Sequence, residues 1–539
     1  MTTQPNIILI LNDDMGYSDI GCYGGEIDTP NLNRLAQQGL RFSQFYNTPR
    51  CSPSRASLLT GLYPHQTGIG ILTYPTGPEG YAGDLNHNCV TIAEVLSAKG
   101  YRNYLSGKWH VSSSLIEPTD SWPIQRGFDE FYGTIIGAGS FYNPNTLTRG
   151  NDNIEHEAEQ DDTFFYTDAI SDQAADFVRQ HKINHCEQPF FQYVAYTAPH
   201  WPLHAHDEDI AKYKGRFDAG WDKLREERLA RLAEAGLIDS KWNLTDRDPS
   251  QPEWTEADQK AWRLRCMEVY AAQIDRMDQG IGRIIQSLEE TGQLDNTLIF
   301  FLADNGACAE DIPDSVTAEE LANELMIARS HTRKGEEVIL GNVSTIMPGG
   351  ENTYQSYGTA WANLSNTPFR LYKHWTHEGG VSTPLICHWP EGINDPGTLR
   401  HTPGHLPDIM RTILDVTGAD YPKEFNGHQI PAPEGKSLKS VFDKDEMPER
   451  SIFWEHEGNA AIRCGKWKMV RNYPGDWELY DMVEDRTEVA NLAGDYAEIV
   501  NSFRLEYDEW AKRCGVIPRE KILEMMKQLP GTAFWEEED

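Results

Sequence analysis

The sequence predicts an α/β fold in which helices cover a mostly parallel β-sheet, followed by a smaller C-terminal α+β domain with an antiparallel sheet. Three observations predict it. Apolar runs alternate with amphipathic stretches over most of the chain, which is typical of a mostly parallel sheet between helices. Near residue 430 the pattern changes to short strand-like pieces. At 539 residues the chain also exceeds the size at which one core keeps growing, so we predict domains at 1–430 and 431–539.

The first domain begins with a strand candidate and then alternates helices and strands. Thr29–Gly39 begins with Thr-Pro and ends with Gly, which are typical helix start and stop signals. Val90–Gly100 has the same pattern and leads directly into a strand. The strand candidates, in chain order, are Asn6–Leu11, Tyr101–Leu105, Phe190–Tyr196, Thr297–Leu302 and Pro384–Trp389.

Three insertions separate these elements. Tyr142–Asp162 is polar and acidic, so we expect a loop. Ala205–Trp262 is highly charged and poor in strand-forming residues, so we expect exposed helices. Cys308–Tyr357 begins acidic and ends rich in glycine, which favours a lid or a contact surface. The insertions offer surface on which copies of the chain could form a homo-oligomer.

The C-terminal domain is expected to hold a small antiparallel sheet and a terminal helix. The helix is predicted at Arg519–Gln528. The short strand candidates are Ser451–Trp454, Ala460–Arg463, Trp467–Val470 and Glu478–Tyr480.

The composition of the chain limits the classes of partner and the cellular compartment that we expect. The formal net charge of -35 repels nucleic acid and anionic membranes, so we expect neither as a partner, although a local basic pocket could still bind an anionic substrate. No segment reaches the ~20 apolar residues that span a bilayer. The N-terminus lacks the features of a signal peptide. The nine cysteines show no CxxC pair or tight spacing, which argues against a disulfide framework. We therefore expect a cytoplasmic protein.

Polar side chains follow four of the predicted strands, at the point where each strand ends. In open α/β sheets, ligands bind beyond the carboxyl ends of the strands. Four such strand ends are hard to explain by a structural need alone. The residues concerned are Asn12, Asp13 and Asp14, then Lys108 and His110, then His200, and finally Asp304 and Asn305.

The two acidic pairs suggest a metal site. Asp13, Asp14, Asp304 and Asn305 all offer oxygen donors, which suit a hard cation such as Ca²⁺ or Mg²⁺ rather than zinc. The alternative is that adjacent acids at a strand end cap the next helix. Because two separate pairs each follow an apolar strand, we favour the metal.

The most specific stretch is Cys51-Ser52-Pro53-Ser54-Arg55, which continues through two leucines to Thr60-Gly61. It resembles the signature of the type I sulfatase family in the alkaline phosphatase superfamily, most of all bacterial arylsulfatases without a signal peptide. Arg50 and Asn103 depart from the family pattern, and Arg50 could affect maturation or leaving-group preference. The supporting matches run in the family's order through nearly the whole chain: Asn12-Asp13-Asp14-Met15-Gly16, Thr29-Pro30-Asn31-Leu32, Gly107-Lys108-Trp109-His110, Ala198-Pro199-His200, Asp304-Asn305-Gly306, Lys373 before Glu378-Gly379-Gly380, Glu478-Leu479-Tyr480-Asp481 and Asn491-Leu492.

The resemblance implies an alkaline-phosphatase-like fold and a modified nucleophile. Cys51 would be oxidised to formylglycine (3-oxoalanine) by a separate formylglycine-generating enzyme. Its hydrated aldehyde would bind one Ca²⁺, with Mg²⁺ or Mn²⁺ as alternatives, together with Asp13, Asp14, Asp304 and Asn305. The metal would lower the pKa of one hydroxyl, which then attacks sulfur. In isolation Cys51 would instead be interpreted as a structural thiol.

The resemblance also implies roles for the remaining polar residues. Arg55 would hold the modified residue, and Lys108 and Lys373 would stabilise charge on the sulfate and the leaving oxygen. Lys182 and Lys334 are weaker competitors for the role of Lys373. His200 would protonate the leaving oxygen, and His110 would take a proton to release sulfate and regenerate the aldehyde. The remaining histidines are expected at the surface or in a satisfied core.

These inferences predict a hydrolase of sulfate monoesters, with aryl sulfates as the expected substrates. The nearest alternative is a phosphonate monoester or phosphodiester hydrolase that shares the formylglycine and the metal. A zinc phosphatase mechanism is less favoured because it would use Ser or Thr as nucleophile. An inactive binding protein is disfavoured because every catalytic role has a suitable residue.

Overall fold

The structure is a computed structural model that describes residues 4–74, 77–315, 317–324 and 326–527. The predicted α/β fold with a C-terminal antiparallel sheet is confirmed. The large sheet has the strand order β12-β2-β11-β8-β1-β7-β3-β4-β5-β6, and β13 also pairs with β2. Its strands are β1 (Asn6–Asn12), β2 (Leu40–Tyr46), β3 (Arg102–Gly107), β4 (Glu130–Thr134), β5 (Leu147–Arg149), β6 (Asp152–Asn153), β7 (Phe190–Ala195), β8 (Thr297–Ala303), β11 (Ser382–His388), β12 (Thr398–Arg400) and β13 (Gly404–His405).

The centre of this sheet is parallel and its margins are mixed. β1 pairs in parallel with both β7 and β8, and β3 pairs in parallel with both β7 and β4. β11 runs antiparallel to β8 and to β2. All five predicted strands of the first domain are present, whereas β2 and β4 were not predicted. β2 mixes Arg41, Ser43 and Gln44 with aromatic residues, so it lacks the continuous apolar run of the central strands.

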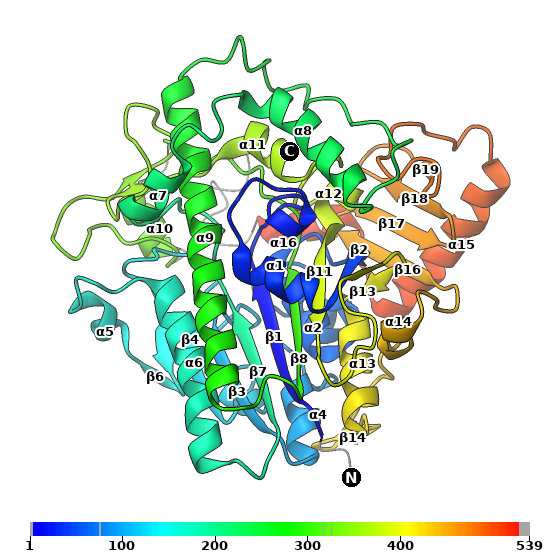
Figure 1. Ribbon diagram of the computed structural model, residues 1–539. Helices are drawn as coiled ribbons and strands as arrows, with labels where there is room; N and C mark the ends of the chain where they lie inside the picture. Colours follow the sequence, from blue (N-terminus) through cyan, green and yellow to red (C-terminus); the bar gives the residue numbers. More distant parts are fainter. Residues whose placement is uncertain (1–3, 75–76, 316, 325, 528–539) are drawn as a thin grey trace.

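Both faces of the sheet are buried, which explains the apolar character of β1. Ile8 and Ile10 join one core with α1 (Pro30–Gln37), α6 (Tyr166–Asn184) and α9 (Lys260–Glu290). Ile7, Leu9 and Leu11 join the other core with α2 (Cys51–Thr60), α4 (Ile92–Ala98) and α13 (Pro407–Thr417). Figure 1 shows the long helix α9 crossing one face of the sheet. Each such aliphatic side chain contributes about 1.5–3 kcal/mol on burial.

The first two insertions differ from the expectation. Tyr142–Asp162 is not only loop, because it contains β5, β6 and α5 (Glu155–Glu159). Ala205–Trp262 is helical as expected, with α7 (Asp207–Tyr213) and α8 (Gly220–Glu234), but the prediction of exposure was wrong. Four side chains at helical spacing bury one face of α8: Trp221, Leu224, Arg228 and Leu232.

The third insertion packs around a small core of its own. Its described part contains α10 (Ala318–Glu324), β9 (Ile339–Leu340) and β10 (Thr353–Tyr354). Ile312, Leu321 and Tyr354 join Trp201 in one apolar cluster. α11 (Gly358–Ser365) and α12 (Glu378–Val381) then lead back to the large sheet.

The C-terminal sheet is antiparallel, in the order β16 (Ser451–His456), β17 (Asn459–Cys464), β18 (Trp467–Arg471) and β19 (Glu478–Asp481). Helix α15 (Ala497–Cys514) packs on it through Tyr507 and Trp510 and was not predicted. Helix α16 (Arg519–Met526) is close to the prediction of Arg519–Gln528, whose last residue lies outside the described residues. The domain boundary near residue 430 stays a prediction. The remaining elements are η1 (Gly21–Tyr23), α3 (Pro64–Thr67), η2 (Glu79–Tyr81), η3 (Ile124–Arg126), β14 (Glu424–Phe425), β15 (His428–Gln429) and α14 (Lys439–Asp443).

Within the described part of the chain, no helix combines the length and the apolar character needed to cross a membrane.

Candidate active site

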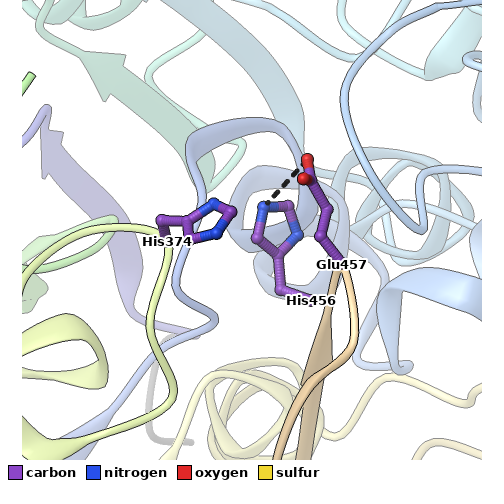
Figure 2. Close-up of side chains that lie close together, drawn as sticks. All are labelled: His374, His456 and Glu457. Carbon is purple, nitrogen blue, oxygen red and sulfur yellow. Dashed lines mark ion pairs between the residues drawn. The ribbon is translucent and has the colours of Figure 1, made fainter. Parts of the chain in front are cut away.

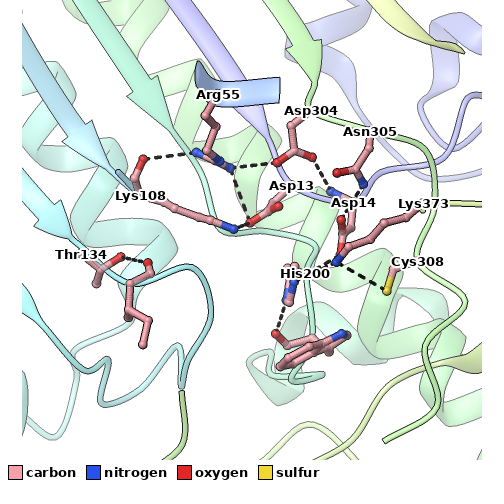
Figure 3. Close-up of polar contacts among 12 residues, drawn as sticks. Asp13, Asp14, Arg55, Lys108, Thr134, His200, Asp304, Asn305, Cys308 and Lys373 are labelled. Atoms are coloured by element: carbon pink, nitrogen blue, oxygen red, sulfur yellow. Dashed lines mark hydrogen bonds and ion pairs between the residues drawn. The ribbon is translucent and has the colours of Figure 1, made fainter. Parts of the chain in front are cut away.

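The two acidic pairs meet beyond the carboxyl ends of β1 and β8. Asp13 and Asp14 follow β1, Asp304 and Asn305 follow β8, and all four are at most 1% exposed. The backbone N–H of Asp14 donates to Asp304 Oδ1 at 3.1 Å, and Asn305 Nδ2 donates to Asp14 Oδ1 at 2.7 Å. Figure 3 shows the four side chains converging on one point. Two neighbouring parallel strands therefore assemble the oxygen donors that the sequence predicted.

The oxygens at this point fit a hard cation. Among the described residues, Asp13 Oδ1 and Asn305 Oδ1 are buried without a hydrogen-bond partner. Burial and the neighbouring charge of Asp13 raise the pKa of Asp304 well above its usual value. A divalent cation would satisfy the two oxygens and relieve the crowding of carboxylates. The donor set contains oxygens only, as Ca²⁺ and Mg²⁺ prefer.

Two buried, positively charged side chains, Arg55 and Lys108, form ion pairs with these carboxylates. Arg55 lies about one turn after Cys51 in α2. Its Nη2 atom is 3.1 Å from Asp304 Oδ2 and 3.5 Å from Asp13 Oδ2. Lys108 follows β3 and places Nζ 2.5 Å from Asp13 Oδ2. Arg55 also donates to the backbone oxygen of Lys108 at 3.2 Å. Burial alone would raise the pKa of Asp13, but Lys108 and Arg55 lower it, so this carboxylate stays ionised.

Cys51 is the first residue of α2 and lies beside this cluster. It is 3% exposed, and every residue of α2 is buried. Ser54 Oγ, one turn later, donates to the backbone oxygen of Asp304 at 2.5 Å and so ties the helix to β8. Burial raises the pKa of the unmodified Cys51 thiol, although Lys108 and Lys373 oppose that shift. A helix N-terminus favours negative charge, which suits a nucleophile at this position.

His200 and Lys373 lie together on the far side of Asp14. Lys373 Nζ is 2.9 Å from Asp14 Oδ2 and 3.4 Å from His200 Nε2. His200 Nδ1 is 2.7 Å from the backbone oxygen of Trp201, so Nδ1 carries the proton that donates there and Nε2 faces the site. Burial alone would lower the pKa of Lys373, but Asp14, Cys308 and Glu310 raise it well above its usual value. Burial lowers the pKa of His200, and Lys373 adds to that shift.

His110 stands two residues beyond Lys108 and is held by a close backbone approach. A Cβ on Gly137 would lie 2.1 Å from His110 Cε1, so only glycine leaves room for the imidazole. Among the described residues, His110 Nδ1 has no hydrogen-bond partner. Burial first, then Lys108 and Arg55, lower the pKa of His110 well below its usual value. The ring is therefore neutral near pH 7 and able to accept a proton.

A cavity of ≈ 190 Å³ opens above these groups. Cys51, His110, His200 and Lys373 form part of its lining. Most of its remaining wall is apolar, formed by Leu72, Tyr74, Leu115, Ile136, Trp201 and Ile327. The structure thus brings all of the predicted site residues to one centre, while their individual catalytic roles stay predictions.

Comparison with known proteins decides the family. Residues 5–419 match the family model described as Sulfatase. The chain belongs to the sulfatase family. Members of this family hydrolyse sulfate esters, so this sulfatase is a sulfuric ester hydrolase. Residues 369–512 also match a model described as N-sulphoglucosamine sulphohydrolase, C-terminal.

The relatives of this sulfatase extend over nearly its whole length. An arylsulfatase of Klebsiella aerogenes is 33% identical, over 81% of this chain and 92% of its own. An uncharacterized sulfatase of Schizosaccharomyces pombe is 32% identical, over 94% of this chain and 92% of its own. The solved structure of Ps i-CgsB is 26% identical with a TM-score of 0.66, and the match covers 94% of this chain and 93% of that one.

Sequence reasoning missed one charged residue of the sulfatase centre, Glu310. Its carboxylate lies 2.8 Å from Arg50 Nη1 and 3.6 Å from Lys373 Nζ, and it accepts a hydrogen bond from Trp201 Nε1 at 2.8 Å. Burial alone would raise the pKa of Glu310, but Lys373 and Arg50 lower it. Glu310 stands in the insertion predicted as a lid or contact surface, where nothing in the local sequence separates it from its acidic neighbours. Arg50, noted as a departure from the family pattern, is its partner.

Proposed function

We propose that this sulfatase hydrolyses sulfate monoesters of aromatic alcohols. The observation that carries this proposal is the apolar wall above Cys51, formed by residues such as Leu115, Ile136 and Trp201. An apolar wall favours a phenyl ring over a hydroxyl-rich sugar, because burying hydroxyls without partners costs free energy. The 33% identical relative from Klebsiella aerogenes is an arylsulfatase, which supports the same substrate class.

The proposal includes a modified Cys51 and one calcium ion. Asp13, Asp14, Asp304 and Asn305 would hold the ion with residue 51, and Mg²⁺ or Mn²⁺ are the alternatives. When bound, such an ion favours the deprotonated form of a neighbouring hydroxyl, and formylglycine supplies that hydroxyl in its hydrated form. The two unpartnered oxygens, Asp13 Oδ1 and Asn305 Oδ1, support the choice of a hard cation.

The buried cations would bind the sulfate group and stabilise its developing charge. Lys373 Nζ lies beside both Asp14 and His200, so it can reach the bridging oxygen of an ester placed over Cys51. Lys108 Nζ approaches from the side of Asp13. Cations aimed at oxygens that gain charge in the transition state are worth several kcal/mol in a site that excludes water. Arg55 is fully buried and forms ion pairs with Asp13 and Asp304, so its role would be to position these carboxylates and the start of α2.

Two histidines would move protons at different steps. His200 keeps Nε2 toward the site because Nδ1 donates to the backbone oxygen of Trp201. With a second proton on Nε2, a form that the Asp14 carboxylate at 3.3 Å favours, the ring would give this Nε2 proton to the leaving oxygen. His110 is neutral and would accept a proton at the step that releases sulfate. His200 would therefore act as the general acid and His110 as the general base.

The maturation partner and the compartment belong to the same proposal. A formylglycine-generating enzyme would act on Cys51 during maturation. None of the nine cysteines, all of which lie in the described part of the chain, forms a disulfide, which supports a reducing compartment such as the cytoplasm. Homo-oligomer formation, and the absence of nucleic acid and membrane partners, stay predictions.

The substrate class is tested by comparing kcat/KM for 4-nitrophenyl sulfate and for a monosaccharide 6-sulfate. We expect the aryl sulfate to be preferred. Leu115→Asn should raise KM for the aryl sulfate and leave kcat nearly unchanged, while the matched variant Leu115→Met should retain both values. A preference of the wild-type protein for the sugar sulfate would contradict the aryl assignment.

A further inference from the structure

A second group of potential metal ligands lies outside the centre described above. His374 directly follows Lys373, His456 is the last residue of β16, and Glu457 begins the turn to β17. One ligand atom of each lies within 4.8 Å of the other two. Figure 2 shows the two imidazole rings and the carboxylate gathered at one place. We propose that His374, His456 and Glu457 form a second metal site, for a divalent transition ion with zinc foremost.

The strongest observation is the state of His456. Its side chain is fully buried, and in the described part of the chain neither of its ring nitrogens has a hydrogen-bond partner. Buried polar groups are nearly always satisfied, so an imidazole with two unpartnered nitrogens needs an explanation. His456 Nε2 lies 3.6 Å from Glu457 Oε1, too far for a hydrogen bond. A metal ion beside these two atoms would satisfy both.

The spacing suits a zinc ion. Zinc binds histidine nitrogen and carboxylate oxygen at about 2.0–2.2 Å, so two ligands of one tetrahedral ion lie roughly 3.3 Å apart. The 3.6 Å between His456 Nε2 and Glu457 Oε1 is close to that value. The ring centroids of His374 and His456 are 5.4 Å apart, and one nitrogen of His374 lies within 4.8 Å of the ligand atoms of the other two residues. The His374 side chain would have to move closer to complete the site.

The charge states also suit a metal. Burial lowers the pKa of His374 and of His456, which leaves both rings neutral near pH 7. Burial alone would raise the pKa of Glu457, but the positive charges of His456 and His374 in their protonated forms, and of Arg519, lower it to about 2. Metal ligands must be deprotonated, so the three side chains are ready to bind. Arg519 holds Glu457 Oε2 at 2.6 Å and leaves Oε1 on the side of His456, as an outer partner of a metal ligand does.

The backbone at two of these three residues has a positive φ angle, which is rare for residues other than glycine. Glu457 has φ 51 and Gly458 has φ 89, so they form a two-residue turn of a kind that favours Asn-Gly or Asp-Gly. His374 has φ 90. Non-glycine residues seldom adopt these conformations, and they persist mainly where function requires them. Two of the three ligands therefore stand at strained positions.

An ion here would join two parts of the chain that are distant in sequence. It would tie the loop that carries Lys373 to the turn between β16 and β17. Three protein ligands leave a fourth position for water or an atom of the substrate, as in other sites with two histidines and one carboxylate. The site does not depend on the chemistry at Cys51.

The test is a titration of the calcium-loaded full chain with Co²⁺, in a large excess of Ca²⁺, followed by displacement with Zn²⁺. We expect one equivalent of Co²⁺ with the visible absorption bands of a four-coordinate site. The Cys51→Ala protein should show the same bands, because Cys51 is not a ligand of this site. Absence of the bands from the wild-type protein, or their loss in Cys51→Ala, would overturn the proposal.

Substitutions of single residues test which side chains bind the ion. His456→Gln and Glu457→Gln should each weaken Co²⁺ binding by more than about tenfold. His405→Gln is the matched control, because His405 is also a buried histidine with a pKa lowered by burial but stands outside the cluster. It should retain wild-type affinity. Unchanged affinity in either variant that folds would contradict the assignment, so the test still holds if one of the two fails to fold.

Discussion

Two of the regions in which this sulfatase buries charged side chains differ in whether the protein alone satisfies those charges. In the junction between α12 and the C-terminal sheet, Glu378 binds Lys468 Nζ at 2.9 Å and Arg486 Nε at 2.8 Å, and accepts from the Tyr46 hydroxyl at 2.9 Å. All four side chains are fully buried. Burial alone would raise the pKa of Glu378, but Lys468 and Arg486 lower it to about 2.

The active centre also buries carboxylates beside lysine and arginine side chains, but in the part of the chain that the structure describes some of its polar atoms are left without hydrogen bonds. Asp13 Oδ1 and Asn305 Oδ1 have no hydrogen-bond partner among the described residues, and the pKa of Asp304 is raised by burial and by Asp13. The junction is complete without a ligand and serves stability. In the active centre we propose that an ion and a substrate satisfy the remaining groups, so that its charges would serve binding and catalysis. We therefore expect substitutions in the active centre to lower activity, and substitutions in the junction at Glu378 to lower stability.

The largest effect is expected at Cys51. Cys51→Ala and Cys51→Ser remove the nucleophile, so kcat for 4-nitrophenyl sulfate should fall by roughly 10⁴-fold or more. The free energy of unfolding should change by no more than about 1 kcal/mol, because no buried charge loses its partner. Steady-state kinetics and urea denaturation on the same protein samples measure both. Wild-type activity in purified Cys51→Ala would contradict the mechanism.

Asp13→Ala should remove both metal and rate. It deletes the carboxylate between Lys108 and the proposed ion, so bound calcium should be lost and kcat should fall by roughly 10³-fold. Metal analysis after gel filtration, together with kinetics, tests this expectation. Asp278→Ala is the control, since it removes a buried carboxylate that accepts hydrogen bonds from the start of α1 and stands outside the active centre. If Asp13→Ala kept calcium and rate, the ligand assignment would be wrong.

Glu378→Ala should have the opposite profile. It leaves Lys468 and Arg486 buried beside a missing partner, which typically costs about 3–5 kcal/mol of stability. kcat/KM of the folded protein should stay near the wild-type value. Denaturation compared with the exposed control Glu424→Ala measures the cost. A large loss of kcat/KM at full folding would show that the two regions are not separate.

The junction should also give the molecule a specific acid sensitivity. The folded pKa of Glu378 is about 2, below the ordinary value of 4.5, so its contribution to stability is fully present above pH 4.5. That contribution is lost as the pH falls from 4.5 through 2, and integration gives about 3 kcal/mol. The stability difference between wild type and Glu378→Gln should therefore shrink over this range. A difference that stays constant would mean that Glu378 is not responsible.

The elements that could be predicted from the sequence are those that a short stretch of residues identifies by itself. β1 and β8 are apolar runs followed at once by acidic pairs, so both the strand and the role of its end could be inferred. β2 and the burial of α8 were missed because their apolar faces are visible only once a partner is known. Glu310 and His456 could not be singled out, since their importance depends on contacts with residues far away in the chain.

The central claim is that this centre hydrolyses sulfate esters with a nucleophile derived from Cys51. The most direct measurement is kcat/KM for 4-nitrophenyl sulfate and for phenyl 4-nitrophenyl phosphonate on one batch of calcium-loaded protein. A clear preference for the sulfate is the predicted result. A preference for the phosphonate would contradict the account, and Lys373 and His200 would then need other roles.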